Sequence, residues 1–390
     1  MSESLARKGR AAKPQEGAHA TSLGKAPKDF VGRDGARKAT KYRLQRFAAD
    51  LAPTHGGLAI CGWKMMPDTA GVAVRGKPGE DGGVEAVAFG HLAVCGSHLC
   101  PVCGPRVADT RRDEVAQVIA WAMGQGLHPV MLTLTTANKM GQALAPMARA
   151  QKAALRAWKR DRRFKERRPA IAGIVSAFET THGGNGWHPH IHLLLLIKAP
   201  TMGRALRLVA GLRAPWVAAA KAEGLHAGRA GFKAHAGEKA AEYMAKWDLA
   251  HEIAAASAKK GRDKGKTPGQ LLRAAYGGDK VAARLWAEYA AAMKGKSVLR
   301  FSPGLRDLAG ILDVSDEQAA QEEGGEGDGL REEVQRWPLI DIIEGDLWEE
   351  AKANGLDRDD LKRAAKEDGR AGIRAYLAEL REAAAFHPLE

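Results

Sequence analysis

The chain has 390 residues, which is enough for a sizeable buried core and for more than one domain. Its 60 Lys and Arg residues outnumber 46 Asp and Glu, and the net charge of +14 indicates a polyanionic partner. Residues 311–390 hold 10 basic and 22 acidic side chains, so the positive charge is concentrated before them. The first 40 residues lack the apolar core of a signal peptide, and no stretch is long enough to span a membrane. We therefore expect a cytoplasmic protein without a membrane partner.

The predicted elements follow one another in a clear order. Apolar periodicity, glycines and β-branched runs predict a helix at 106–125, a strand at 130–136, a helix at 142–163, strands at 171–181 and 188–197, a helix at 202–222, a strand at 230–236, helices at 238–256 and 268–293, and a strand at 298–301. The order from 127 to 256 is β, α, β, β, α, β, α. An antiparallel sheet with helices on one face, as in ferredoxin-like α+β domains, accommodates that order.

Five segments are predicted from these elements and from composition. Residues 1–45 are basic and poor in large apolar side chains, which is typical of a disordered tail. Residues 46–126 form a cysteine-rich module and a helix, and residues 127–256 form the α+β core. Residues 257–311 are a basic loop with a helical extension, and residues 312–390 are an acidic linker followed by helices.

A histidine-rich strand carries the strongest chemical signal, in the sequence WHPHIH at 187–192. Alternate residues of a strand share a face, so His190 and His192 can converge on one ion, whereas His188 lies one step too far. If the preceding turn spans 183–186, antiparallel pairing places Glu179 opposite His190 as a third ligand. Two imidazoles and a carboxylate suit Mn²⁺ or Mg²⁺ and leave Zn²⁺ possible. The alternative is a pair of ordinary sheet histidines.

A tyrosine flanked by cations lies in the predicted helix at 238–256. Helical spacing places Lys239, Tyr243 and Lys246 on one face. A neighbouring ammonium favours the phenolate and neutralises an approaching phosphate, so Tyr243 is a candidate nucleophile for a phosphodiester. The alternative is a tyrosine that packs its ring on the sheet.

These motifs resemble those of the HUH endonucleases, and specifically the plasmid rolling-circle replication initiators with a single catalytic tyrosine. LTLTT at 132–136 is similar to the family's first motif, WHPHIH at 187–192 to its metal motif and EYMAK at 242–246 to its tyrosine motif. The segment CGSHLCPVC at 95–103 is similar to a cysteine-rich stretch before the first motif. With SPGLR at 302–306 as a weaker match, the resemblance covers about residues 60–305.

The resemblance implies a site-specific single-strand endonuclease that nicks a plasmid origin. Tyr243 would become linked to the 5′-phosphate, the free 3′-OH would prime synthesis, and the strand would later be rejoined. Many family members carry an acidic residue one turn before the tyrosine, where this chain has Lys239, so Glu238 or Glu242 would activate water at termination. No ATP-binding loop is found, which implies a host helicase as partner. A relaxase or a single-strand transposase shares the same chemistry.

The four cysteines predict a structural zinc site. Cys95, Cys100 and Cys103 fall within nine residues, and Cys61 supplies a fourth thiolate, with His98 as an alternative to Cys61. Free buried cysteines are the other interpretation.

A basic run at 156–168 predicts a surface for single-stranded DNA, with Trp158 and Phe164 as stacking platforms. The alternative is a solvated helix face. With Lys239, the candidate DNA-binding residues are Arg156, Lys159, Arg160, Arg162 and Arg163.

Two other functions remain open from the sequence. A histidine-triad nucleotide hydrolase also uses alternating histidines, and a non-catalytic zinc DNA-binding regulator would explain the charge and the cysteines without chemistry. Covalent attachment of DNA to Tyr243 distinguishes the nuclease from both.

Overall fold

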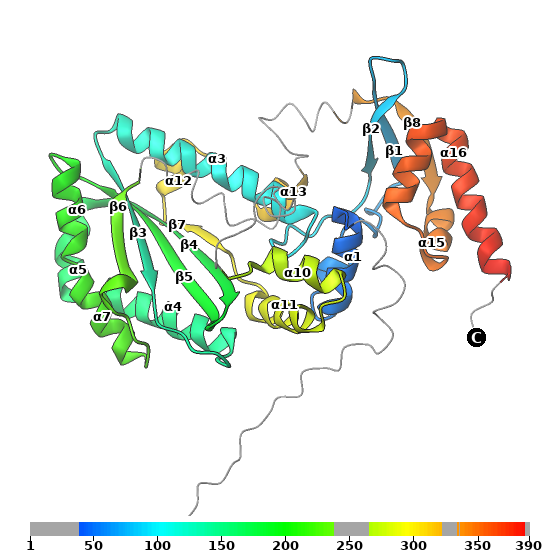
Figure 1. The fold of residues 1–390 in the computed structure, drawn as a ribbon. Coiled ribbons are helices and arrows are strands. Elements are labelled where there is room, and N and C mark those ends of the chain that lie inside the picture. Colours follow the sequence, from blue (N-terminus) through cyan, green and yellow to red (C-terminus); the bar gives the residue numbers. More distant parts are fainter. Residues whose placement is uncertain (1–38, 238–264, 322–333, 335, 387–390) are drawn as a thin grey trace, which may run out of the picture.

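The computed structural model describes residues 39–237, 265–321, 334 and 336–386. These residues form two antiparallel sheets flanked by helices (Figure 1). One sheet has five strands in the order β6-β3-β5-β4-β7, and the other has three strands in the order β2-β1-β8. The predicted fold class, an antiparallel α+β core with a cysteine cluster before it and helices at the C-terminal end, is confirmed.

The five-stranded sheet follows the predicted order of elements. Its strands are β3 (His128–Thr135), β4 (Ile171–Gly183), β5 (Gly186–Ile197), β6 (Phe232–Ala236) and β7 (Leu299–Phe301). The connecting helices are α4 (Leu144–Arg160), α5 (Arg162–Arg167), α6 (Met202–Ala210) and α7 (Arg213–Ala222), with 3-10 turns at Arg168–Ala170 and Arg229–Gly231. The predicted helix at 142–163 is divided, because the Asp161 carboxylate accepts a hydrogen bond from the Arg163 amide at 2.8 Å and begins α5.

Strand alternation divides the core between the two faces of this sheet. Leu132, Leu193 and Leu195 pack against helices α4, α6 and α7, together with Ile174, Phe178 and Ile191. Leu194 and Leu196 pack on the opposite face against α3 (Cys103–Gly124). Helices α3 and α4 thus lie on opposite sides of the sheet (Figure 1). The prediction of helices on one face omitted α3, which covers part of the other.

The three-stranded sheet joins two distant parts of the chain. It comprises β1 (Gly71–Pro78), β2 (Val84–Gly90) and β8 (Leu339–Glu344), and α15 (Gly345–Ala353) and α16 (Arg358–Phe386) belong to the same core, with a kink at Asp368 and Gly369. Alternate side chains of β8 face the helices. Among them, Ile343 is fully buried and Asp341 binds Arg374. The predicted segments 46–126 and 312–390 thus each contribute strands to one sheet, because β1 pairs with β8.

The remaining helices are α1 (Lys41–Leu51), α2 (Gly56–Ile60), α10 (Pro268–Tyr276), α11 (Lys280–Met293), α12 (Leu305–Leu308) and α13 (Asp316–Gln321). Helix α1 begins inside the range 1–45 predicted to be a disordered tail, because Thr40 caps it and its apolar residues pack in the core. Helix α13 lies within the predicted linker, where Arg111 binds the Asp316 carboxylate at 2.7 Å. None of the helices described here has the length and apolarity that crossing a membrane requires.

A buried arginine fastens helix α16 to the N-terminal part of the chain. Arg358 is only 3% exposed, and it donates hydrogen bonds to the carbonyl oxygen of Gly62 at 2.8 Å and to the side-chain oxygen of Gln45 at 3.2 Å. Its guanidinium lies 4.2 Å from the ring centroid of Tyr42 and 4.5 Å from that of Trp63. A charge removed from water this completely depends on its partners.

We expect Arg358→Met to lower the free energy of unfolding by about 2–4 kcal/mol, because it removes the donor to the buried Gly62 carbonyl and both ring contacts. The Gln45 side-chain oxygen loses one donor and keeps the bond from Nε1 of Trp63. Arg363→Met on the same helix is the control. Its side chain is 62% exposed and forms only surface ion pairs, so its effect should stay within about 0.5 kcal/mol. Urea denaturation measures both, and equal losses would contradict the assigned role.

Candidate metal centres and active site

The structure brings Glu179, His190 and His192 together on one face of the five-stranded sheet. Gly183 pairs with Gly186 across the turn, and the ladder then places Glu179 opposite His190, as the predicted register requires. One ligand atom from each of the three side chains lies within 4.8 Å of the others. This spacing suits a shared divalent cation, since nitrogen and oxygen ligands lie roughly 2.0–2.2 Å from such an ion.

The position of this group along β5 sets its surroundings among the described residues. The side chains of residues 190 and 192 alternate with the core residues of β5 and face the same side as Leu194 and Leu196. Helix α3 covers those two leucines, and the group lies further along the strand. His192 is 4% exposed, whereas the Glu179 side chain is 28% exposed. The group therefore combines a buried imidazole with a carboxylate that solvent or substrate can reach.

His192 is oriented from both of its ring nitrogens. Nε2 lies 3.0 Å from Oε2 of Glu179, and Nδ1 lies 3.1 Å from Oγ1 of Thr133 on the neighbouring strand β3. A hydrogen bond to one ring nitrogen fixes the tautomer and leaves the other nitrogen to bind an ion. Thr133 belongs to the LTLTT motif, which the sequence singled out by resemblance without assigning this orienting contact.

The His190 imidazole has the properties of a metal ligand. Burial and the neighbouring His188 lower its pKa to about 4, so the imidazole is neutral at physiological pH. Its Nδ1 is buried and has no hydrogen-bond partner among the described residues. The ring of His188 lies 4.3 Å from that of His190, but His188 is not part of the group whose ligand atoms converge. A neutral, buried and unpaired nitrogen fits a metal ligand.

All four cysteines converge on a second site. Sγ of Cys61 lies 3.3 Å from Sγ of Cys103 and 3.6 Å from that of Cys100, and the Cys95 and Cys103 sulfurs are 3.7 Å apart. Four thiolates around a tetrahedral metal at roughly 2.3 Å would be about 3.8 Å from one another. Hydrogen bonds from the other three thiols lower the pKa of the Cys103 thiol. The cluster can therefore hold a metal through sulfur alone.

His98 does not join this cluster, although the sequence offered it as an alternative to Cys61. The group of converging ligands contains the four cysteines without it. Burial lowers the pKa of His98 to about 4, and its Nε2 is buried without a hydrogen-bond partner among the described residues.

The basic run on α4 and α5 lies away from Glu179, His190 and His192, which are called the metal group below. Helix α4 packs on the opposite face of the sheet, and Arg156, Arg160, Arg162 and Arg163 are exposed there, while Lys159 is half-buried. The prediction that Trp158 and Phe164 form stacking platforms is wrong. Both are buried, and their ring centroids lie 4.7 Å apart in the core. Trp158 also donates to the Leu212 carbonyl at 2.9 Å.

The predicted tyrosine helix lies outside the described residues. This applies to the candidate catalytic residues Glu238, Glu242, Tyr243 and Lys246 and to the candidate DNA-binding residue Lys239. The strand that leads toward them, β6, forms the edge of the five-stranded sheet next to β3.

The sheet with His190 and His192 on one face defines an antiparallel α+β protein with a candidate metal centre, and sequence comparisons show which proteins it is similar to. Residues 88–205 match a family model described as replication protein. The matched segment contains three of the four cysteines and all of the Glu179, His190 and His192 group. The predicted resemblance to plasmid replication initiators is thereby confirmed.

One curated relative is also similar to the chain. A protein of Streptomyces cyanogenus described as a neomycin resistance protein is 28% identical over 167 residues. The similarity covers 36% of this chain and 37% of that protein, so the chain spans little more than a third of its relative. No solved structure matches.

Proposed function

We propose that this protein is a plasmid rolling-circle replication initiator that nicks one DNA strand at the origin. The observation that carries the proposal is the convergence of Glu179, His190 and His192 inside a segment that matches a replication protein family. Mn²⁺ or Mg²⁺ bound there would polarise the scissile phosphate and stabilise the charge that develops on it. The same match supports DNA as the partner.

In the proposed reaction, the Tyr243 oxygen attacks the scissile phosphorus as the phenol loses its proton. A bond forms between that oxygen and the phosphorus, and the bond from phosphorus to the 3′-oxygen breaks. The departing 3′-oxygen takes up a proton and becomes the primer end. Lys246 and Lys239 favour the phenolate, and Glu238 or Glu242 activates water at termination. Attack by the 3′-OH on the phosphotyrosine reverses the first step and rejoins the strand.

The four cysteines are proposed to bind zinc in a structural role, since a cluster closed by four protein ligands leaves no open position for substrate. A host helicase is the proposed partner for unwinding, because the chain has no ATP-binding loop of its own.

Covalent trapping tests the proposed function. The protein is incubated with Mn²⁺ and single-stranded oligonucleotides that tile its replicon, and a denaturant-resistant mass shift is sought. We expect an adduct with the unaltered protein and none with Tyr243→Phe, which keeps the ring and removes the nucleophile. If folded, metal-loaded protein forms no adduct on any oligonucleotide, the proposal is wrong. Nucleotide hydrolysis that survives Tyr243→Phe would indicate the histidine-triad activity instead.

A further inference from the structure

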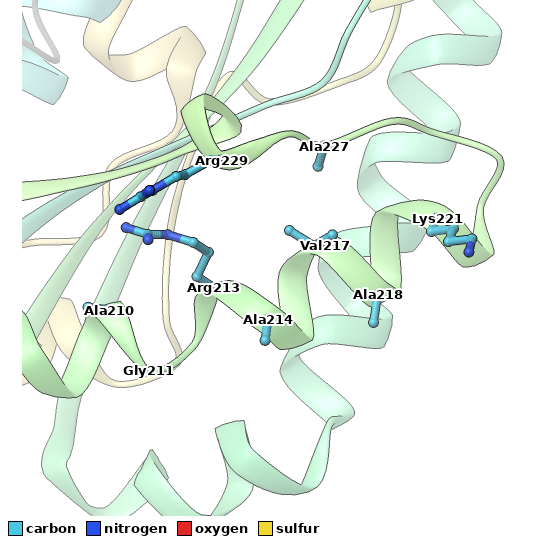
Figure 2. Close-up of a pocket in the computed structure, with 9 residues that line it drawn as sticks. All are labelled: Ala210, Gly211, Arg213, Ala214, Val217, Ala218, Lys221, Ala227 and Arg229. Carbon is cyan, nitrogen blue, oxygen red and sulfur yellow. The ribbon is translucent and has the colours of Figure 1, made fainter.

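An open pocket beside the edge of the five-stranded sheet has three cationic side chains in its lining. Its lining residues are Ala210, Gly211, Arg213, Ala214, Val217, Ala218, Lys221, Ala227 and Arg229 (Figure 2). They come from the end of α6, from α7 and from the segment before β6, and none is acidic. In Figure 2 the guanidinium groups of Arg213 and Arg229 point to the same end of the pocket, while Lys221 lies at the other.

Neither guanidinium has a carboxylate partner among the residues that the structure describes. No hydrogen bond or ion pair joins the side chain of Arg213 or Arg229 to any residue in the described parts of the chain, and Nε of Arg213 is buried without a partner. The Arg213 guanidinium lies 5.8 Å from the ring centroid of Phe232, three residues after Arg229, which keeps the two arginines in one locality. Two unpaired guanidinium groups in one place favour an anion between them.

A third arginine borders the same pocket. A Cβ at Gly211 would lie 2.8 Å from a terminal nitrogen of Arg167, so this guanidinium lies against the bare backbone of the pocket wall. Arg167 is anchored by donating to the Arg163 carbonyl at 3.0 Å. Planar guanidinium groups bind phosphate oxygens through paired hydrogen bonds, which ammonium groups do not reproduce.

The pocket lies at the end of the sheet that carries the metal group. Gly231 packs so closely on β3 that a Cβ there would lie 2.5 Å from the Thr135 carbonyl oxygen, and Thr135 pairs with His190. The amide of Ala137 also donates to the His226 carbonyl at 2.8 Å. The segment 226–231, which includes Arg229, therefore runs beside the strand end next to the metal group.

We infer that Arg213 and Arg229 hold a backbone phosphate of the single DNA strand that enters the metal group across the edge formed by β6. This inference rests on the proposed function and deepens it by naming where the strand is held. The pocket is open and lacks an aromatic lining, which suits a phosphodiester of a passing strand and gives no stacking platform for a base. Arg213 and Arg229 are positioning residues in this assignment.

The test measures binding of a fluorescein-labelled oligothymidylate by anisotropy, in EDTA and over a salt series. We expect Arg213→Gln/Arg229→Gln to weaken binding on the order of tenfold or more at low salt. The slope of log affinity against log salt should become shallower by about 0.7, since the two arginines hold one phosphate and each phosphate contact to a single strand contributes about 0.7. Arg213→Lys/Arg229→Lys should restore the slope and only part of the affinity.

Arg204→Gln/Arg207→Gln is the matched control, because it removes two exposed arginines from neighbouring α6 that do not line the pocket. If Arg213→Gln/Arg229→Gln and this control bind the oligonucleotide with equal affinity, the inference is overturned. The proposed nicking is not affected by that result, since the binding assay in EDTA does not include the metal-dependent step. Failure of the unaltered protein to bind the oligonucleotide would overturn both. A covalent adduct yield that falls at limiting DNA and recovers at saturating DNA supports a binding role for the two arginines.

Discussion

Replacing His192 with alanine is expected to abolish metal-dependent cleavage of single-stranded DNA. The imidazole is 4% exposed, lies 3.0 Å from Glu179 and is oriented by Thr133, and among the described residues the converging group consists of Glu179, His190 and His192. A metal ion contributes several kcal/mol to stabilising the transition state of phosphoryl transfer, which corresponds to a rate loss of roughly a thousandfold. Quantifying the covalent adduct over time, with calorimetric titration of Mn²⁺, measures both rate and affinity.

His188→Ala is the matched control for this experiment. His188 lies on the same strand and the same face, and its ring contacts His190, yet it is not part of the converging group. Cleavage by this variant should remain within a few-fold of the unaltered protein. If the His188 and His192 variants lose activity and Mn²⁺ affinity equally, the assigned ligand set is incorrect.

Replacing Cys100 and Cys103 with serine is expected to release zinc and unfold the segment that surrounds the cluster. Both residues are fully buried, and the core around them includes Leu44 and Leu58 of the N-terminal helices. Structural zinc contributes roughly 10–16 kcal/mol of apparent binding free energy in small zinc domains at neutral pH. We therefore expect thermal melting by circular dichroism to show loss of cooperative unfolding, or a melting temperature lower by more than about 10 °C.

Ser97→Ala is the control in the same loop, since the Ser97 hydroxyl only accepts a hydrogen bond from the Leu99 amide at 3.2 Å. It should retain zinc, measured by elemental analysis of the purified protein, and should melt within a few degrees of the unaltered protein. Unaltered protein that contains no zinc after expression in zinc-replete medium would refute the structural zinc site.

The register of the β4–β5 hairpin could be predicted because it depends on local chemistry. Glycines at 183, 184 and 186 around Asn185 specify a short turn, and Gly186 adopts a positive φ of 82° that other residues rarely tolerate. Once the turn is fixed, period-two alternation determines which side chain faces Glu179. The convergence of Glu179, His190 and His192 can therefore be predicted from about twenty consecutive residues.

Burial of Trp158 on the basic helix α4 was harder to predict, because the helix carries both an apolar stripe and a charged run, and Trp158 could belong to either. Trp158 follows Ala154 by one turn and continues the buried stripe of α4 that includes Met147 and Gln151. The charged neighbours of Trp158 favoured a DNA-facing tryptophan. Only the packing of Trp158 against Phe164 and Trp216 shows that the ring is buried, and Trp216 belongs to α7, which is distant from α4 in sequence.

Pairing between β1 and β8 could not be predicted, since about 260 residues separate the two strands. No turn links them, so neither strand carries a local signal of its partner. The Arg213 and Arg229 pair was missed for a similar reason, because alanine-rich sequence separates the arginines and carries no motif.

The pairing of β1 with β8 has a consequence for the order of events on the ribosome. Domains generally fold as they emerge, at roughly 5–20 residues per second, so β1 waits on the order of ten to fifty seconds for its partner strand. All five strands of the sheet that carries Glu179, His190 and His192 have been synthesised by Phe301, before β8 begins at Leu339. The edge of β1 stays unpaired during that interval, and an open edge invites pairing with another chain. Nascent chains stalled before residue 339 should therefore aggregate through β1, although the strands that carry Glu179, His190 and His192 are complete.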